Sequence, residues 1–159
     1  MQRKGKSLTV EQAKQKALRY CAYQERSHQE VKNKLYELGL NSSDADELLT
    51  YLITEGFLNE ERYAKLFAGG KFRIKHWGRI KIVHALESKG LSRNCIRIGL
   101  KEIDEDDYVL TLKRLISEKV AEHRGENLSI ARDKVSKALI QKGYEPELVW
   151  KILKTNLPE

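Results

Sequence analysis

The sequence predicts an all-α fold, an elongated and curved array of three tandem three-helix repeats. The main observation is a pattern in which an aliphatic residue is followed by Leu four positions later and by Gly four positions after that. It occurs at Val31, Leu35 and Gly39, at Ile82, Leu86 and Gly90, and at Val135, Leu139 and Gly143. Because a short helical unit cannot bury its apolar face alone, three such units in series predict a stacked array with an open surface.

Two further observations support this fold class. Apolar residues recur at spacings of three and four, without sustained alternation of apolar and polar residues, and the chain has only two prolines. Each repeated glycine is expected to end its helix as a left-handed cap. We expect the repeats to occupy residues 9–55, 56–102 and 103–155, after a flexible basic N-terminus (1–8) and before a short tail (156–159).

The expected helix starts agree with this division. In the first repeat, Thr9 and Gln12 have the spacing of a capping box, as do Ser27 and Glu30. Later starts are marked by Asn59 and Asp104, which precede acidic first turns, and by Pro146, which suits a first helical turn. All three repeats therefore contain recognisable helix N-termini.

The helix expected from residue 59 to about residue 76 has one apolar stripe. This stripe consists of Tyr63, Leu66, Phe67, Gly70 and Ile74. Gly70 is expected to mark a close approach of another helix. Phe72 points about 180° from the stripe, which places it either on an outer face among cations or beneath a neighbouring helix. Trp77, at the turn that follows, is expected to fill a corner between repeats.

Composition limits the classes of function. The net charge of +7 and the pI near 9.3 favour an acidic partner, such as nucleic acid, a nucleoprotein or an acidic protein surface. The absence of a membrane-spanning apolar run and of a signal peptide predicts a cytoplasmic protein without membrane contact. Cys21 and Cys95 are expected to be two buried thiols. No residues with the spacing of a metal, cofactor or catalytic site stand out, so we expect neither an enzyme nor a cofactor.

The most basic surface is expected between residues 63 and 86, a segment without Asp or Glu. Its six positive charges are Lys65, Lys71, Arg73, Lys75, Arg79 and Lys81. An aromatic residue among cations on an outer face suits contact with nucleic acid or with an acidic protein groove.

Several motifs in this order resemble those of the RecX family, bacterial regulators of the RecA recombinase. They are Gln24-Glu25-Arg26-Ser27, then Glu55-Gly56-Phe57-Leu58-Asn59-Glu60-Glu61-Arg62-Tyr63-Ala64, then Trp77-Gly78-Arg79-Ile80 and Lys89-Gly90-Leu91. The resemblance extends from about residue 17 to residue 153. Phe57 and Glu60 stand where the family often has Tyr and Asp, which preserves an aromatic side chain and an acidic first turn.

The resemblance implies tandem three-helix repeats and binding within the groove of the RecA filament on single-stranded DNA. It further implies restraint of strand exchange, of ATP turnover and of the filament-stimulated self-cleavage of the LexA repressor. We expect a monomer that occludes the groove without chemistry and that binds DNA directly only weakly.

The candidate contacts lie mainly at the junction of the first two repeats. They are Lys71, Phe72, Arg73, Lys75, Arg79 and Lys81, with Arg26 and Lys32 added from the first repeat. Leu58, Arg62 and Tyr63 match a family motif and are expected to fix the junction instead. Two alternatives stay open, a stand-alone DNA-binding protein without sequence preference and a helical adaptor for an acidic protein.

Overall fold

The computed structural model describes residues 8–156, which form nine α-helices and no strand. The first unit contains α1 (Val10–Tyr23), α2 (His28–Glu37) and α3 (Ser42–Thr54); the second contains α4 (Glu60–Lys75), α5 (Arg79–Ser88) and α6 (Arg93–Leu100); the third contains α7 (Glu105–Glu122), α8 (Leu128–Gln141) and α9 (Pro146–Asn156). Apart from residues 8 and 156, the expected N-terminal segment and tail lie outside the described residues.

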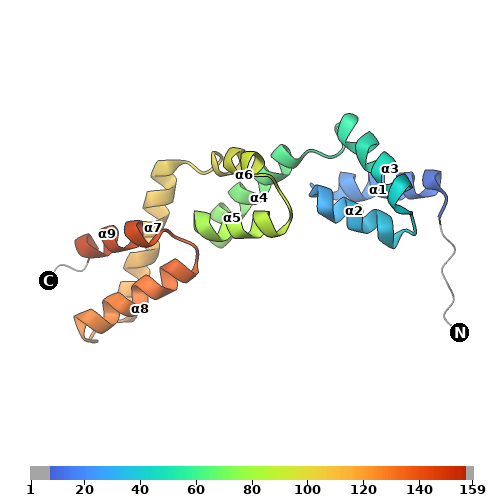
Figure 1. Ribbon diagram of the computed structural model, residues 1–159. Helices are drawn as coiled ribbons and strands as arrows, with labels where there is room; N and C mark the ends of the chain where they lie inside the picture. Colours follow the sequence, from blue (N-terminus) through green and yellow to red (C-terminus); the bar gives the residue numbers. More distant parts are fainter. Residues whose placement is uncertain (1–7, 157–159) are drawn as a thin grey trace, which may run out of the picture.

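The three units follow one another in an elongated row, with α1 near one end and α9 near the other (Figure 1). Helix packing is most extensive within a unit, and the tightest pair is formed by α4 and α6. The predicted all-α array of three tandem three-helix repeats is confirmed.

The repeated glycines end α2, α5 and α8 as predicted. Gly39, Gly90 and Gly143 have φ angles of 91°, 81° and 106°, the left-handed region in which a residue without Cβ is favoured. His76, which follows α4, also has a positive φ, of 56°, although it is not glycine. Its carbonyl oxygen accepts a hydrogen bond from the Tyr144 hydroxyl at 2.8 Å, which ties this turn to the third unit.

One of the two predicted capping boxes is complete. The Thr9 hydroxyl accepts from the backbone N–H of Gln12, whose side chain accepts from the Thr9 N–H. Ser27 caps α2 by accepting from the Glu30 N–H, but the Glu30 carboxylate turns away. It accepts hydrogen bonds from the Tyr63 hydroxyl and from Lys89 of the second unit. The second capping box is therefore replaced by a contact between units.

The buried residues form two hydrophobic cores of different extent. The first unit has a core of its own, centred on fully buried residues such as Val31, Leu35 and Leu52. A second core runs without interruption through the second and third units, and includes Ile82 and Leu139. The second and third units are thus joined through a shared core, whereas the first unit meets the second through mostly polar contacts.

The junction of the second and third units brings two backbone segments together. The N–H of Gly78 donates to the Lys142 carbonyl, and the N–H of Ile80 donates to the Gly143 carbonyl, each at 2.9 Å. A Cβ on Gly78 would lie 2.2 Å from the carbonyl carbon of Gly143. Only glycine at residue 78 leaves room for this contact.

The sequence predicted close helix packing at Gly70, but in the structure it occurs at Gly99. A Cβ on Gly99 would lie 2.7 Å from the Ala64 carbonyl oxygen, so α6 crosses α4 at this point. A Cβ on Gly70 would meet nothing within 4 Å.

The two thiols are less buried than the sequence predicted, because Cys21 and Cys95 are free and only partly buried.

Candidate functional site

The exposed face of α4 differs from the one predicted from its apolar spacing. Ala64, Ala68 and Phe72 are buried, whereas Leu66 is 56% exposed and Ile74 is 76% exposed. The small side chains of Ala64 and Ala68 lie one helical turn apart and permit the close approach of α6. Because that approach decides which way α4 faces, part of the expected apolar stripe lies on the surface.

Phe72 is therefore not a surface contact, contrary to the sequence-based expectation. It is 5% exposed, and its ring centroid lies 5.7 Å from that of Tyr108. Tyr108 in turn packs on Tyr144, with centroids 5.2 Å apart. These three rings lie in the core shared by the second and third units, so Phe72 stabilises their junction.

Arg79 is also engaged within the protein, so it is not available as a free cation. Its guanidinium lies 2.7 Å from a Glu105 carboxylate oxygen and 2.9 Å from one of Glu145, and it covers the Tyr108 ring. Burial opposes its charged form, but the hydrogen bond to Glu105 and the charge of Glu145 outweigh burial and raise the pKa of Arg79. The arginine thus fixes the junction of the second and third units.

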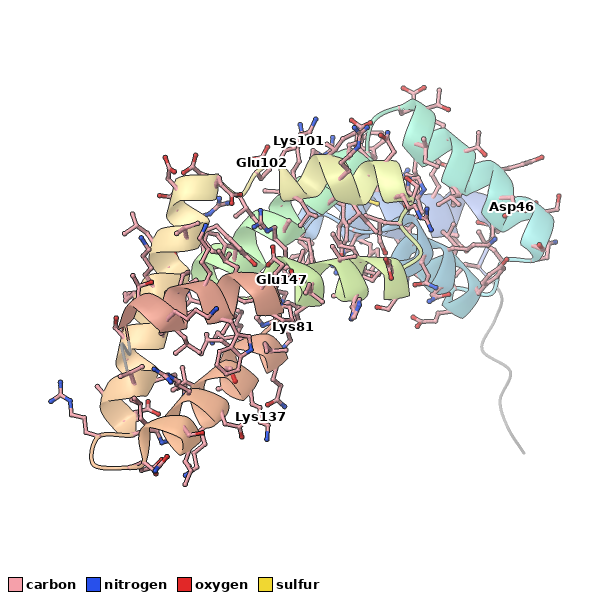
Figure 2. All side chains as sticks on the ribbon, turned by 60° about the vertical axis from the view of Figure 1, so that its left-hand side comes forward. Asp46, Lys81, Lys101, Glu102, Lys137 and Glu147 are labelled. Carbon is pink, nitrogen blue, oxygen red and sulfur yellow. The ribbon has the colours of Figure 1, made fainter. Side chains whose placement is uncertain are left out.

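A cluster of aromatic rings and lysines lies on the second half of α4, the turn that follows it and the start of α5. The Lys71 ammonium lies 5.4 Å from the Phe67 ring centroid and 5.0 Å from that of Trp77. The Lys81 ammonium lies 4.5 Å from the Trp77 centroid. Lys81 is labelled on α5 in Figure 2, and its Cβ lies against the turn that follows α8. Trp77 also packs edge-on against Phe67, so its ring contacts with Phe67, Lys71 and Lys81 all lie within the second unit, and its role between repeats stays a prediction.

A cleft runs along the exposed face of α4 toward the first unit. Its larger part has a volume of about 560 Å³ and its smaller part about 210 Å³, and both are lined by Leu66, Phe67 and Lys71. The larger part is completed by Gln24, Glu25, Glu30, Tyr63 and Lys89, and the smaller part by Gly70, Ile74 and Lys75. We call this surface the α4 cleft. It has an apolar floor, with carboxylates of the first unit and Lys89 in its larger part, Lys75 in its smaller part, and Lys71 in both.

The junction between the first two units forms one side of the α4 cleft. Arg62 pairs with Glu25, and the Tyr63 hydroxyl donates to Glu30 at 3.0 Å. Burial and the neighbouring Glu30 carboxylate raise the pKa of Tyr63, so its hydroxyl stays protonated as the donor. The predicted role of Arg62 and Tyr63 at the junction is confirmed.

The remaining candidate cations do not form one cluster. Lys71 and Lys75 line the α4 cleft, and Arg73 is exposed beside it, with its guanidinium against Gly69. The Lys32 ammonium lies 3.7 Å from a carboxylate oxygen of Asp46, within the first unit. Arg26 packs on Tyr20, also within the first unit. The structure therefore brings together Lys71 and Lys75, and adds Leu66 and Ile74, which the sequence-based prediction placed on the packed side.

Residues 8–156 contain no group of His, Cys, Asp and Glu side chains suited to a metal ion, and no helix among them has the length and apolar character needed to cross a membrane. The candidate site is instead a surface of packed rings, aliphatic side chains and lysines.

Comparison with known proteins identifies the family. The model of the first three-helix domain of RecX matches residues 13–52, and the model of its second three-helix domain matches residues 59–100. The two matches together cover just over half of the chain. The chain belongs to the RecX family. Both helices that flank the α4 cleft, α2 and α4, lie within the matched regions of this RecX family member.

Individual relatives agree with this assignment. The protein is 29% identical over 136 residues to "Regulatory protein RecX" of Lactococcus lactis subsp. cremoris (strain SK11), a match that covers 84% of this chain and 51% of the relative. It is also 29% identical over 133 residues to the protein of the same name from Clostridium perfringens (strain SM101 / Type A), covering 82% of this chain and 62% of the relative. The chain thus spans about half to three fifths of the length of these relatives.

The fold has a close counterpart among solved structures. The crystal structure of RecX from Lactobacillus salivarius superposes with a TM-score of 0.85 at 21% identity, and the match covers 92% of this chain and 95% of that chain. This similarity shows that the array of helical units is the RecX fold.

Proposed function

We propose that this RecX family member regulates the RecA recombinase by binding in the groove of the RecA filament on single-stranded DNA. Family membership gives the class of regulatory protein. The elongated row of units suits a ligand that lies along a helical groove and spans neighbouring subunits. Occlusion of the space that duplex DNA or the LexA repressor would need restrains strand exchange, ATP turnover and LexA cleavage, without catalysis or a cofactor.

The single observation that carries the proposed contact is the α4 cleft. Leu66 and Ile74 expose aliphatic side chains in a segment without carboxylates, and Lys71 and Lys75 lie next to them. Apolar anchors surrounded by charge are typical of specific protein interfaces, where the anchors supply affinity and the charges favour complementary partners. We therefore assign the main filament contact to this face, with Arg73 at its edge and Lys81 beyond Trp77.

A sedimentation experiment tests this assignment. RecA filaments are assembled on single-stranded DNA, pelleted with the wild-type protein, and the bound fraction is compared with that of the variant Leu66→Ser/Ile74→Ser. We expect the variant to lose binding by about tenfold or more, because two anchors are removed. The matched control is Leu110→Ser/Ile130→Ser, which alters exposed aliphatic residues of similar exposure in the third unit. Equal binding by all three proteins would exclude the α4 cleft as the filament contact.

The charged part of the contact is tested separately. The variant Lys71→Glu/Arg73→Glu/Lys75→Glu is expected to lose restraint of the filament, while circular dichroism shows unchanged helicity. Because Lys71 also covers two rings, the variant Lys71→Gln/Arg73→Gln/Lys75→Gln is measured beside it to separate loss of stacking from charge reversal. Full inhibition by the Glu variant would contradict the assignment.

The stand-alone DNA-binding alternative has its own outcome. That alternative would be favoured if the protein bound DNA tightly without recombinase and bound the RecA filament no more tightly than it bound the bare DNA strand. Binding to filaments that exceeds binding to the bare strand supports the proposed function.

A further inference from the structure

A second cationic surface lies on the first unit, outside the α4 cleft. Lys16, Arg19, Tyr20 and Tyr23 fall at spacings of three, four and seven along α1 and so share one helix face. Arg26, in the loop after α1, and Lys34 of α2 complete a concavity of about 370 Å³. We call these six residues the tyrosine–cation surface.

The electrostatics of this surface are one-sided. Its lining includes four cationic side chains and no carboxylate. Within residues 8–156, no carboxylate lies at ion-pair distance from Lys16, Arg19 or Arg26. The one acidic neighbour at such a distance is Glu37, whose oxygen lies 3.9 Å from the Lys34 ammonium. Lys16, Arg19 and Arg26 are therefore available to an anionic ligand, and Lys34 has one exposed acidic neighbour.

The aromatic groups form an open stacking platform. The Arg26 guanidinium lies 3.8 Å from the Tyr20 ring centroid and 5.8 Å from that of Tyr23. A hydrogen bond of 3.1 Å from the Arg26 Nε to the Tyr20 carbonyl fixes the guanidinium in place. Tyr23 is 82% exposed, which leaves a flat aromatic ring in water beside several positive charges. Burial, the largest influence, raises the pKa of Tyr20, so the platform carries no negative charge from its hydroxyl.

We propose that the tyrosine–cation surface binds single-stranded nucleic acid, with phosphates on Lys16, Arg19 and Lys34 and a base stacked on Tyr23. A positive groove that follows the backbone, combined with aromatic rings for the bases, is the chemistry of sequence-tolerant single-strand binding. An acidic protein helix fits less well, because Leu38 is the one aliphatic side chain that lines the concavity. This inference goes beyond the proposed filament contact, since it lies on another unit and requires no recombinase.

The test uses the full chain and a fluorescein-labelled oligothymidylate, measured by fluorescence anisotropy at low salt without RecA. Tyr23→Ala is expected to weaken binding by about 5- to 150-fold, the range of one base–aromatic stack. Tyr23→Phe, which keeps the ring, is expected to bind as the wild type does. The control Phe57→Ala removes a half-exposed ring elsewhere and is expected to change nothing.

The charge contribution has its own readout. Lys16→Glu/Arg19→Glu is expected to weaken binding and to reduce the slope of log K against log salt by about 1.4, which corresponds to two single-strand phosphate contacts. The control Lys101→Glu/Lys113→Glu makes the same charge change on exposed lysines of the other units and is expected to leave the slope closer to that of the wild type.

Three results would overturn the inference. The first is the absence of measurable oligothymidylate binding. The second is equal binding by Tyr23→Ala, Lys16→Glu/Arg19→Glu and the wild type. The third is binding of oligoglutamate as tight as that of the oligonucleotide, which would indicate a protein partner. The two proposals fail independently. Tyr23→Ala is expected to keep its affinity for the α4-dependent filament contact, and Leu66→Ser/Ile74→Ser is expected to keep its affinity for oligothymidylate.

Discussion

A methyl group at residue 78 tests how the second and third units are joined. Gly78 has φ −74° and ψ 163°, angles that alanine adopts without strain, so the backbone conformation does not require glycine. The available space does, because the new Cβ would lie 2.2 to 2.3 Å from backbone atoms of Gly143 and Tyr144. Backbone atoms cannot rotate away as a flexible side chain would. The Gly78→Ala variant must therefore push the two units apart.

The expected cost follows from the contacts that this movement disrupts. Overpacking in a well-packed site costs about 1–3 kcal/mol, and each of the two backbone hydrogen bonds at the junction contributes about 1 kcal/mol. We expect Gly78→Ala to lower the free energy of unfolding by about 3 kcal/mol. Gly70→Ala is the matched control, because a Cβ there meets nothing within 4 Å. It is expected to raise the stability by about 1 kcal/mol through the higher helix propensity of alanine.

Urea denaturation followed by circular dichroism measures both variants. The opposite signs are the essential result, since the same chemical change is made at both glycines. A Gly78→Ala protein within about 0.5 kcal/mol of the wild type would refute the close backbone contact. A Gly70→Ala protein that loses stability would show that another element packs against that part of α4.

Further predictions concern the aromatic core at the same junction. Phe72→Ala is expected to lower the free energy of unfolding by about 3–5 kcal/mol, as for an aromatic ring in the core. A change below about 1 kcal/mol in urea denaturation would indicate that the Phe72 side chain lies on the surface. Tyr108→Phe removes the hydroxyl that accepts from the Arg79 backbone N–H and donates to Oε1 of Glu145, although Oε2 keeps its ion pair with Arg79, and is expected to cost about 1–3 kcal/mol by the same assay. Burial raises the pKa of Tyr108 and Tyr144 above the ordinary value for tyrosine, so their contribution to stability is complete below about pH 10 and decreases as the pH rises further. Thermal melts that do not change between pH 9 and pH 11 would contradict this assignment.

Much of the fold follows from local rules that act within a few residues. The helix ends at Gly39, Gly90 and Gly143 depend on a left-handed backbone that glycine favours, and the cap at Thr9 depends on a hydroxyl next to free N–H groups. Neither feature needs information about distant parts of the chain. These elements and their threefold repetition were therefore predictable.

The orientation of α4 was not predictable from apolar spacing, because a distant residue decides it. Its sequence has large apolar residues on one side and Ala64, Ala68 and Gly69 on another. The close approach of Gly99 from α6 selects the side with small residues. The selection buries Phe72 and exposes Ile74. The run of small residues at helical spacing was the available signal, since such residues allow two helix backbones to approach closely.

Whether a charged side chain is free or paired was also not predictable from the neighbouring sequence. The absence of carboxylates near Arg79 in the sequence suggested a free cation, but Glu105 and Glu145 reach it from the third unit. The tyrosine–cation surface was overlooked for the opposite reason. Residues 12–24 also lack Asp and Glu, and they contain Tyr20 and Tyr23 among basic residues, so the same criterion applied to α1 would have found this surface.

The rate of RecA-dependent ATP hydrolysis on single-stranded DNA reports whether the protein acts on the filament through the α4 cleft. The protein is added at increasing ratios, beginning well below one molecule per RecA subunit, together with the Leu66→Ser/Ile74→Ser and Leu110→Ser/Ile130→Ser variants. Binding through the α4 cleft predicts that the wild type and the third-unit variant lower the rate, and that the α4 variant leaves it unchanged. An unchanged rate with the wild type at every ratio, or equal inhibition by all three proteins, would contradict this account.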